Sequence, residues 1–148
     1  AAWVTRVEIG KGGSVKERIM NSIRFLTPAI HGLGDYAAAV ALIVLPFLLG
    51  FSGVALWLSV AGGVGLTLYS LITDYRFGVA SVISFRVHEV LDLSAAAAFI
   101  AAPFVFGWTG LVMGYYLVMA AGVIVVVALT NPDPDVTDTV EPRLPVGS

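Results

Sequence analysis

Cysteine is absent from the 148 residues, and charged residues make up only 12% of the chain. The lack of cysteine excludes disulfides, thiolate catalysis and cysteine-ligated metal sites. A soluble domain usually carries about 25% charged residues, so this chain has too few to cover a water-exposed surface. A net charge of -2 gives no reason to expect a nucleic-acid partner. Apolar residues instead reach 58% and the mean hydropathy is +0.93, which indicates an integral membrane protein.

Motifs of hydrolytic and phosphoryl-transfer enzymes are also missing. The sequence contains no G-x-S-x-G elbow, no phosphate-binding loop and no H-E-x-x-H motif. We therefore expect a protein without enzymatic activity.

Four stretches are long and apolar enough to cross a bilayer, which takes about 20 residues. They cover residues 28–50, 53–73, 86–107 and 110–130. Very short turns separate the first from the second and the third from the fourth, so each pair must be antiparallel neighbours. The sequence predicts an all-α membrane protein with four transmembrane helices in two tandem helical hairpins.

The two hairpins repeat one another at a constant offset without a gap. His31 aligns with His88, and Asp35 aligns with Asp92. Further aligned pairs are Pro46 with Pro103, Phe47 with Phe104, Gly50 with Gly107, Gly53 with Gly110, Gly65 with Gly122, and Thr73 with Thr130. Each copy holds an even number of spans, so both have one orientation. We expect a pseudo-twofold axis along the membrane normal.

The predicted organisation has five parts. An N-terminal segment, 1–27, contains a short amphipathic helix that begins at a capping box and lies on the membrane surface. The first two-helix repeat covers 28–74, a linker covers 75–84, and the second repeat covers 85–131. The acidic, proline-rich tail, 132–148, is expected to be disordered.

All 8 lysines and arginines lie outside the two tight turns. The positive-inside rule therefore places both termini and the linker in the cytoplasm. The opposite side of the membrane should carry a belt of interfacial aromatic residues, namely Phe51, Trp57, Trp108, Tyr115 and Tyr116.

A proline followed by an aromatic residue recurs near the end of the first and third spans. The two stretches are Leu45-Pro46-Phe47 and Ala102-Pro103-Phe104. In this the chain resembles the SPW-repeat family of small bacterial membrane proteins, which have a two-helix repeat with Ser-Pro-Trp in its first helix. The proline and the aromatic type are kept here, whereas the serine and the tryptophan are not. The resemblance covers about two thirds of the chain and implies a multi-pass protein of the bacterial inner membrane, with no established activity and no catalytic residues.

Small residues and prolines predict local features of the bundle. Gly62, Gly63, Gly65 and Gly122 should allow helices to approach closely, either within one chain, which we favour, or in a homo-oligomer. Pro46 and Pro103 each remove a helical amide, so we expect a bend near the outer surface at both.

Four polar residues lie one to two turns inside the predicted spans: His31, Asp35, His88 and Asp92. Each histidine is four residues from an aspartate and shares its helix face. An aspartate in the middle of a span costs roughly 2.5–3.5 kcal/mol, so two of them in matched positions need an explanation.

Three explanations are open. The first is structural: a His–Asp pair within each helix, or an aspartate paired with Arg24, Arg76 or Arg86. The second is a ligand site, with His31, His88 and two carboxylates around zinc or iron, or the two histidines as axial haem ligands. The third is a proton or ion path through Asp35 and Asp92.

The sequence favours the structural explanation. The expected function is a non-enzymatic accessory or scaffold subunit that self-associates or packs against a larger membrane complex. The alternative is a metal- or haem-binding redox membrane protein that uses His31 and His88, and the third is a small conduit that uses Asp35 and Asp92. No cofactor is favoured, and the lipid bilayer is the one partner that composition implies.

Overall fold

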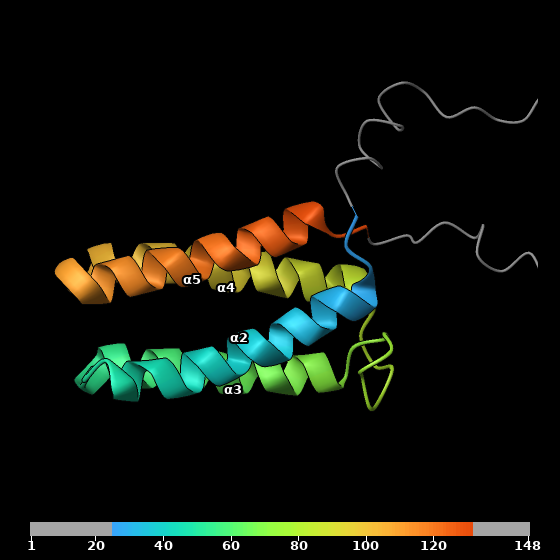
Figure 1. Ribbon diagram of the computed structural model, residues 1–148, viewed down its shortest axis with the longest axis horizontal. Helices are drawn as coiled ribbons and strands as arrows, with labels where there is room; N and C mark the ends of the chain where they lie inside the picture. The colour runs from blue at the N-terminus through green and yellow to red at the C-terminus, as the bar shows by residue number, and fades with distance from the viewer. Residues whose placement is uncertain (1–24, 132–148) are drawn as a thin grey trace, which may run out of the picture.

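The computed structural model describes residues 25–131. Within this range four helices follow one another: α2 (Pro28–Leu48), α3 (Gly53–Leu71), α4 (Phe85–Phe106) and α5 (Gly110–Leu129) (Figure 1). All 4 are long and apolar enough to cross a membrane, which indicates a multi-pass membrane protein. The described residues form no strand beyond two isolated bridges. The prediction of an all-helical chain with four candidate spans is confirmed, whereas the predicted surface helix before residue 25 and the acidic tail lie outside the described residues.

Polar side chains cap α2 and α4 at the end of the bundle near the linker. The Thr27 hydroxyl accepts a hydrogen bond from the Ile30 amide at 3.3 Å, and Pro28 occupies the first turn of α2. The Ser84 hydroxyl accepts one from the Val87 amide at 3.4 Å. Each cap satisfies a backbone donor that would otherwise be free at a helix start.

The two tight turns have one backbone conformation. Gly50 and Gly53 have φ angles of 69° and 57°, and Gly107 and Gly110 have φ angles of 66° and 59°. This left-handed region strongly favours glycine. The turns make α2 antiparallel to α3 and α4 antiparallel to α5, so the bundle consists of two hairpins (Figure 1).

Pro46 and Pro103 lie inside α2 and α4, which continue to Leu48 and Phe106. Both prolines are buried. Each proline carbonyl accepts a hydrogen bond from an aromatic residue of the following turn. The Phe51 amide donates to Pro46 at 2.9 Å and the Trp108 amide donates to Pro103 at 2.8 Å. These two backbone hydrogen bonds tie each tight turn to the end of the helix before it.

Two short bridges connect the hairpins where the chain enters and leaves them. Leu26, before α2, pairs with Thr130, after α5, and Ile83, before α4, pairs with Thr73, after α3. The Leu26 amide donates to the Leu129 carbonyl at 3.0 Å, and the Ile83 amide donates to the Ile72 carbonyl at 3.0 Å. Each bridge joins the start of one hairpin to the end of the other.

Tyr115 and Tyr116 face the interior, which corrects their assignment to an interfacial belt. Tyr116 is fully buried and donates a hydrogen bond to the Ala55 carbonyl at 2.7 Å. The Tyr115 hydroxyl lies 2.6 Å from that of Ser59. Buried tyrosines need such a partner, and here the neighbouring hairpin supplies it. Trp57, by contrast, is 62% exposed.

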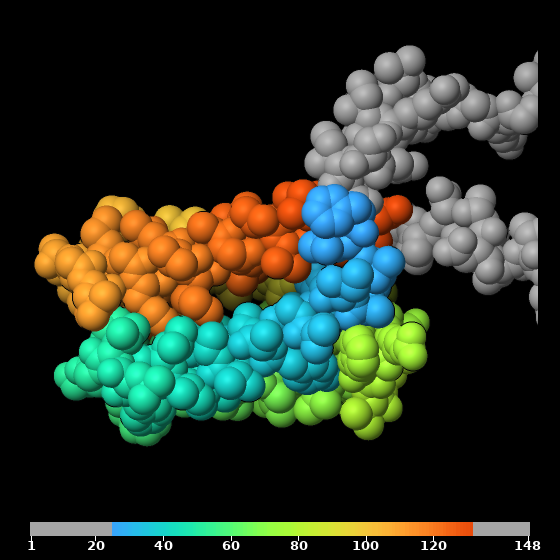
Figure 2. Space-filling view, in the orientation of Figure 1, coloured from blue at the N-terminus to red at the C-terminus, as the bar shows by residue number. Residues whose placement is uncertain are grey.

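The four glycines expected at helix contacts occupy two kinds of position. A Cβ atom at Gly63 would lie 2.8 Å from the Ala39 carbonyl oxygen, so α2 and α3 touch there. At Gly62 it would lie 2.8 Å from the Phe99 ring of α4. Gly65 and Gly122 have nothing within 4 Å of such an atom. They instead border a cavity between the hairpins, whose mouth is visible as a hollow between α2 and α5 (Figure 2).

Candidate metal centre

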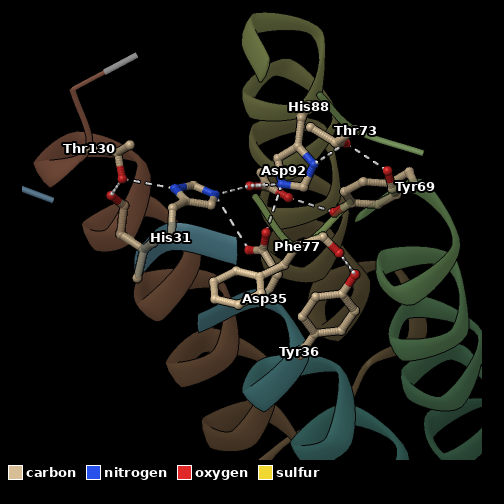
Figure 3. Close-up of polar contacts among 10 residues, drawn as sticks. His31, Asp35, Tyr36, Tyr69, Thr73, Phe77, His88, Asp92 and Thr130 are labelled. Carbon is tan, nitrogen blue, oxygen red and sulfur yellow. Dashed lines mark hydrogen bonds and ion pairs between the residues drawn. The ribbon is translucent and has the colours of Figure 1, made fainter. Parts of the chain in front are cut away.

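The two His–Asp pairs meet between the hairpins. His31 and Asp35 come from the first turns of α2, and His88 and Asp92 come from the first turns of α4 (Figure 3). All four are buried, with exposed fractions between 0% and 6%. Their ligand atoms lie within 4.8 Å of one another. We refer to these four residues as the His–Asp cluster.

The shortest contacts in the His–Asp cluster run across the two hairpins. Nε2 of His31 lies 3.0 Å from Oδ2 of Asp92, and Nε2 of His88 lies 3.0 Å from Oδ2 of Asp35. The contacts within each helix are longer, at 3.4 Å for His31 with Asp35 and 3.3 Å for His88 with Asp92. The pairing within one helix that spacing predicts is therefore present but secondary. Both aspartates pair with both histidines, while the proposed partner Arg24 lies outside the described residues.

A threonine holds the other ring nitrogen of each histidine. The Thr73 hydroxyl donates its only proton to the Tyr69 carbonyl at 2.7 Å, so it must accept from Nδ1 of His88, which is 2.9 Å away. The Thr130 hydroxyl likewise donates to a carbonyl of its own helix at 2.7 Å and lies 2.8 Å from Nδ1 of His31. Both Nδ1 atoms therefore carry hydrogen, and both Nε2 atoms face carboxylates.

This arrangement needs positive charge between each Nε2 atom and its carboxylate. With Nδ1 protonated, a neutral histidine has a bare lone pair on Nε2, which would repel an ionised carboxylate. Two protons, one for each histidine, would remove the repulsion. A single divalent cation bound by the two Nε2 atoms and the two carboxylates would do the same.

The second hairpin lacks one polar partner that the first has. The Tyr69 hydroxyl of α3 donates to Oδ1 of Asp92 at 2.6 Å (Figure 3). Val126 of α5 occupies the aligned position, and Asp35 has no such donor from it. Oδ2 of Asp35 and Nε2 of His88 are both buried and neither forms a well-directed hydrogen bond with another described group, although they lie 3.0 Å apart.

Aromatic rings cover the cluster on the side of the linker. The Phe85 ring stacks on His88 with centroids 5.8 Å apart and meets His31 edge-on at 5.1 Å. Tyr75 of the linker meets the His88 ring at 5.8 Å and fits against Gly32, where a side chain would collide with it. Burial raises the pKa of the Tyr75 hydroxyl, which keeps it a neutral phenol. Water is thus held away from the histidines.

Three contributors to the site were not expected from the sequence: Thr73, Thr130 and Tyr69. A usable signal existed for the threonines, because they repeat at the same offset as the histidines. Tyr69 has no repeat partner, so its contact with Asp92 depends on the packing of α3 against α4.

No protein-family model, curated protein or solved structure matches this chain.

Proposed function

We propose that this chain is a membrane protein that binds one divalent transition-metal ion, of the zinc or ferrous-iron class, in the His–Asp cluster. The convergence of four buried ligand atoms within 4.8 Å carries this proposal. Imidazole and carboxylate together suit zinc and iron, whereas magnesium and calcium favour oxygen ligands alone.

The spacing of the ligands supports an ion of this size. Ligands about 2.0–2.2 Å from a tetrahedral ion lie about 3.3–3.6 Å from each other. The four nitrogen–oxygen distances, two of which involve different oxygens of Asp35, run from 3.0 to 3.4 Å. Small side-chain movements would therefore complete the coordination shell, and the threonines already direct both Nε2 atoms inward.

Charge balance is a second support. Two ionised carboxylates and two neutral histidines carry a charge of minus two, which one divalent ion cancels. A neutral assembly avoids most of the cost of burying charge in an apolar surrounding.

Four protein ligands leave no open position on a tetrahedral ion, which is typical of structural rather than catalytic sites. The ion would tie α2 to α4, and so one hairpin to the other. This agrees with a non-enzymatic accessory or scaffold role, in a homo-oligomer or a larger complex. A strictly monomeric protein without a partner in mild detergent would count against that role.

We also propose that the hairpins are tandem repeats related by a pseudo-twofold axis along the membrane normal. The aligned turns, the matched bridges and the equivalent threonine–histidine contacts support it. We also propose that the chain belongs to the SPW-repeat family and lies in the bacterial inner membrane. Both of its termini would then lie in the cytoplasm.

The two other ligand and transport hypotheses have less support. A haem iron held by both histidines would need a porphyrin between rings whose centroids are 5.4 Å apart, where the two carboxylates already lie. A conduit through Asp35 and Asp92 would continue into a cavity lined mainly by apolar residues. Unchanged ion flux in liposomes with both aspartates replaced by asparagine would exclude the conduit.

Metal analysis of the purified full chain tests the proposal. The protein is stripped with a chelator, reloaded with Zn²⁺ or Co²⁺, and separated from free ion. We expect about one ion per chain, a tetrahedral cobalt spectrum and no Soret band. His31→Gln with His88→Gln should abolish binding, whereas Ser59→Ala, a buried change away from the cluster, should not. Absence of bound metal, or equal binding by the double variant, would refute the proposal.

A further inference from the structure

The cavity between the hairpins has a volume of about 490 Å³. One end is closed by polar groups of Asp35, Asp92 and Tyr69, and the remaining wall is made of apolar side chains and glycines. A pocket of this size, mostly apolar with a few converging polar groups, is typical of small-molecule sites.

At the polar end, Asp92 has a hydroxyl donor that Asp35 lacks. Asp92 receives the Tyr69 hydroxyl at 2.6 Å, and Val126 provides no hydroxyl for Asp35. Asp35 is only 6% exposed and lines the cavity; its Oδ2 faces Nε2 of His88 at 3.0 Å and its Oδ1 lies 3.4 Å from Nε2 of His31, and no hydroxyl among the described residues donates to either oxygen. A carboxylate has about four lone-pair sites, so Asp35 can accept a hydrogen bond from a ligand hydroxyl while it stays paired with the histidines, as Asp92 does from Tyr69.

The cavity also opens toward the surroundings of the bundle. Val118, which lines it, is 70% exposed, and the hollow between α2 and α5 leads into the same space (Figure 2). Because this lateral surface is apolar, a ligand that enters through it must itself dissolve in lipid.

We propose that the cavity binds a lipophilic molecule with a phenol-like hydroxyl group, which donates to Asp35 as Tyr69 donates to Asp92. Its apolar part lies along Gly65 and Gly122, where no atom fills the space of a side chain. A carboxylate accepts this hydrogen bond whether its other partner is a metal ion or a proton, so the inference does not rest on the proposed metal.

A matched pair of probes tests the inference. Tritium-labelled 4-nonylphenol is added to the full chain in nanodiscs, and unlabelled 4-nonylphenol or its methyl ether competes. The ether has a similar shape but no donor. We expect saturable binding, with competition by the ether weaker by about tenfold to a hundredfold. A lack of saturable binding, or equal competition by the ether, would overturn the inference.

Variants of the cavity locate the site. Val126→Tyr would supply an internal hydroxyl and fill the space beside Asp35, so binding should be lost. Gly122→Leu fills the apolar part of the cavity and should also abolish binding. It keeps the inference testable if Val126→Tyr does not fold. Trp57→Leu, an exposed change outside the cavity, should leave binding intact. Unchanged binding in both folded cavity variants would overturn the inference.

The binding assay is run on chelator-treated and on zinc-loaded protein. Phenol binding without any metal uptake would refute only the proposed metal function. Metal uptake without phenol binding would refute only the cavity ligand.

Discussion

Asp92 lies closer to His31 of the other hairpin, at 3.0 Å, than to His88 of its own helix, at 3.3 Å. The two residues are 61 positions apart in the sequence. Each hairpin therefore balances a buried charge of the other, so neither hairpin has a self-sufficient polar site. Loss of one partner would leave an uncompensated group in the interior, which is strongly destabilising.

The two aspartates should differ in their effect on stability. Asp92→Asn weakens contacts with His31, His88 and Tyr69, whereas the contacts described for Asp35 are with the two histidines. Breaking a buried pair costs about 3–5 kcal/mol, and a further hydrogen bond to a charged group adds about 1.5–3 kcal/mol. We expect both variants to lower the free energy of unfolding, and Asp92→Asn to lower it more, in mixed-micelle denaturation.

Asp74→Asn provides the control, since Asp74 is exposed and, among the contacts described, its side chain is bonded only to Ser81. Its effect should stay within about 0.5 kcal/mol. A larger loss for Asp35→Asn than for Asp92→Asn would contradict the role given to Tyr69.

The threonines should control metal affinity without touching the metal. Thr73→Val and Thr130→Val keep the shape of the side chain but remove the acceptor for Nδ1 of each histidine. Loss of such a supporting contact typically weakens metal binding about 10- to 100-fold. Competition with a chromogenic chelator would measure the change.

Thr67→Val is the matched control, because the Thr67 hydroxyl bonds only to the Gly63 carbonyl in its own helix, at 2.9 Å. Its metal affinity should equal that of the parent chain. Equal affinities in all three variants would show that the threonines do not orient the histidines.

Two glycines of α3 should respond in opposite ways to a single methyl group. Gly63→Ala forces Cβ to within 2.8 Å of the Ala39 carbonyl and of the Ile43 side chain, and overpacking of this kind costs about 1–3 kcal/mol. Gly65→Ala meets nothing within 4 Å and should be neutral or stabilising by up to about 1 kcal/mol. Denaturation midpoints of the two variants would test this, and equal midpoints would contradict the close contact of α2 with α3.

Membrane orientation can be tested by labelling. Ser52 lies in the tight turn after α2 and Ser81 lies in the linker before α4, and both are exposed. With the basic segments in the cytoplasm, a cysteine at Ser52 should react with an impermeant maleimide added outside intact cells. A cysteine at Ser81 should react only after lysis. The reverse pattern would overturn the proposed orientation.

The sequence predicted the helices well because length, apolarity and turn glycines are local properties. It also placed each histidine on one face with an aspartate, which the structure shows for His31 with Asp35 at 3.4 Å. Helix spacing does not define how two helices rotate against each other, so the convergence of the two pairs stayed open.

Contacts between residues far apart in the sequence could not be predicted from helix spacing. Thr130 is 99 residues from His31, and although it repeats Thr73 at the same offset as the histidines, that offset does not show which residue it contacts. Tyr115 and Tyr116 were misplaced because an aromatic residue near a tight turn suits the interface as well as the interior. Hydrogen bonds to Ser59 and to the Ala55 carbonyl hold the two tyrosines in the interior. Ser59 and Ala55 both belong to the other hairpin.

The pairing of Leu26 with Thr130 brings the two ends of the helical region into hydrogen-bonding contact, as Thr73 and Ile83 are brought together across the linker. The order in which the hairpins occur in the chain is therefore not required by their packing. A circularly permuted chain, with a short peptide joining residue 131 to residue 25 and new ends opened at residues 78–79, should assemble the same bundle with the second hairpin first.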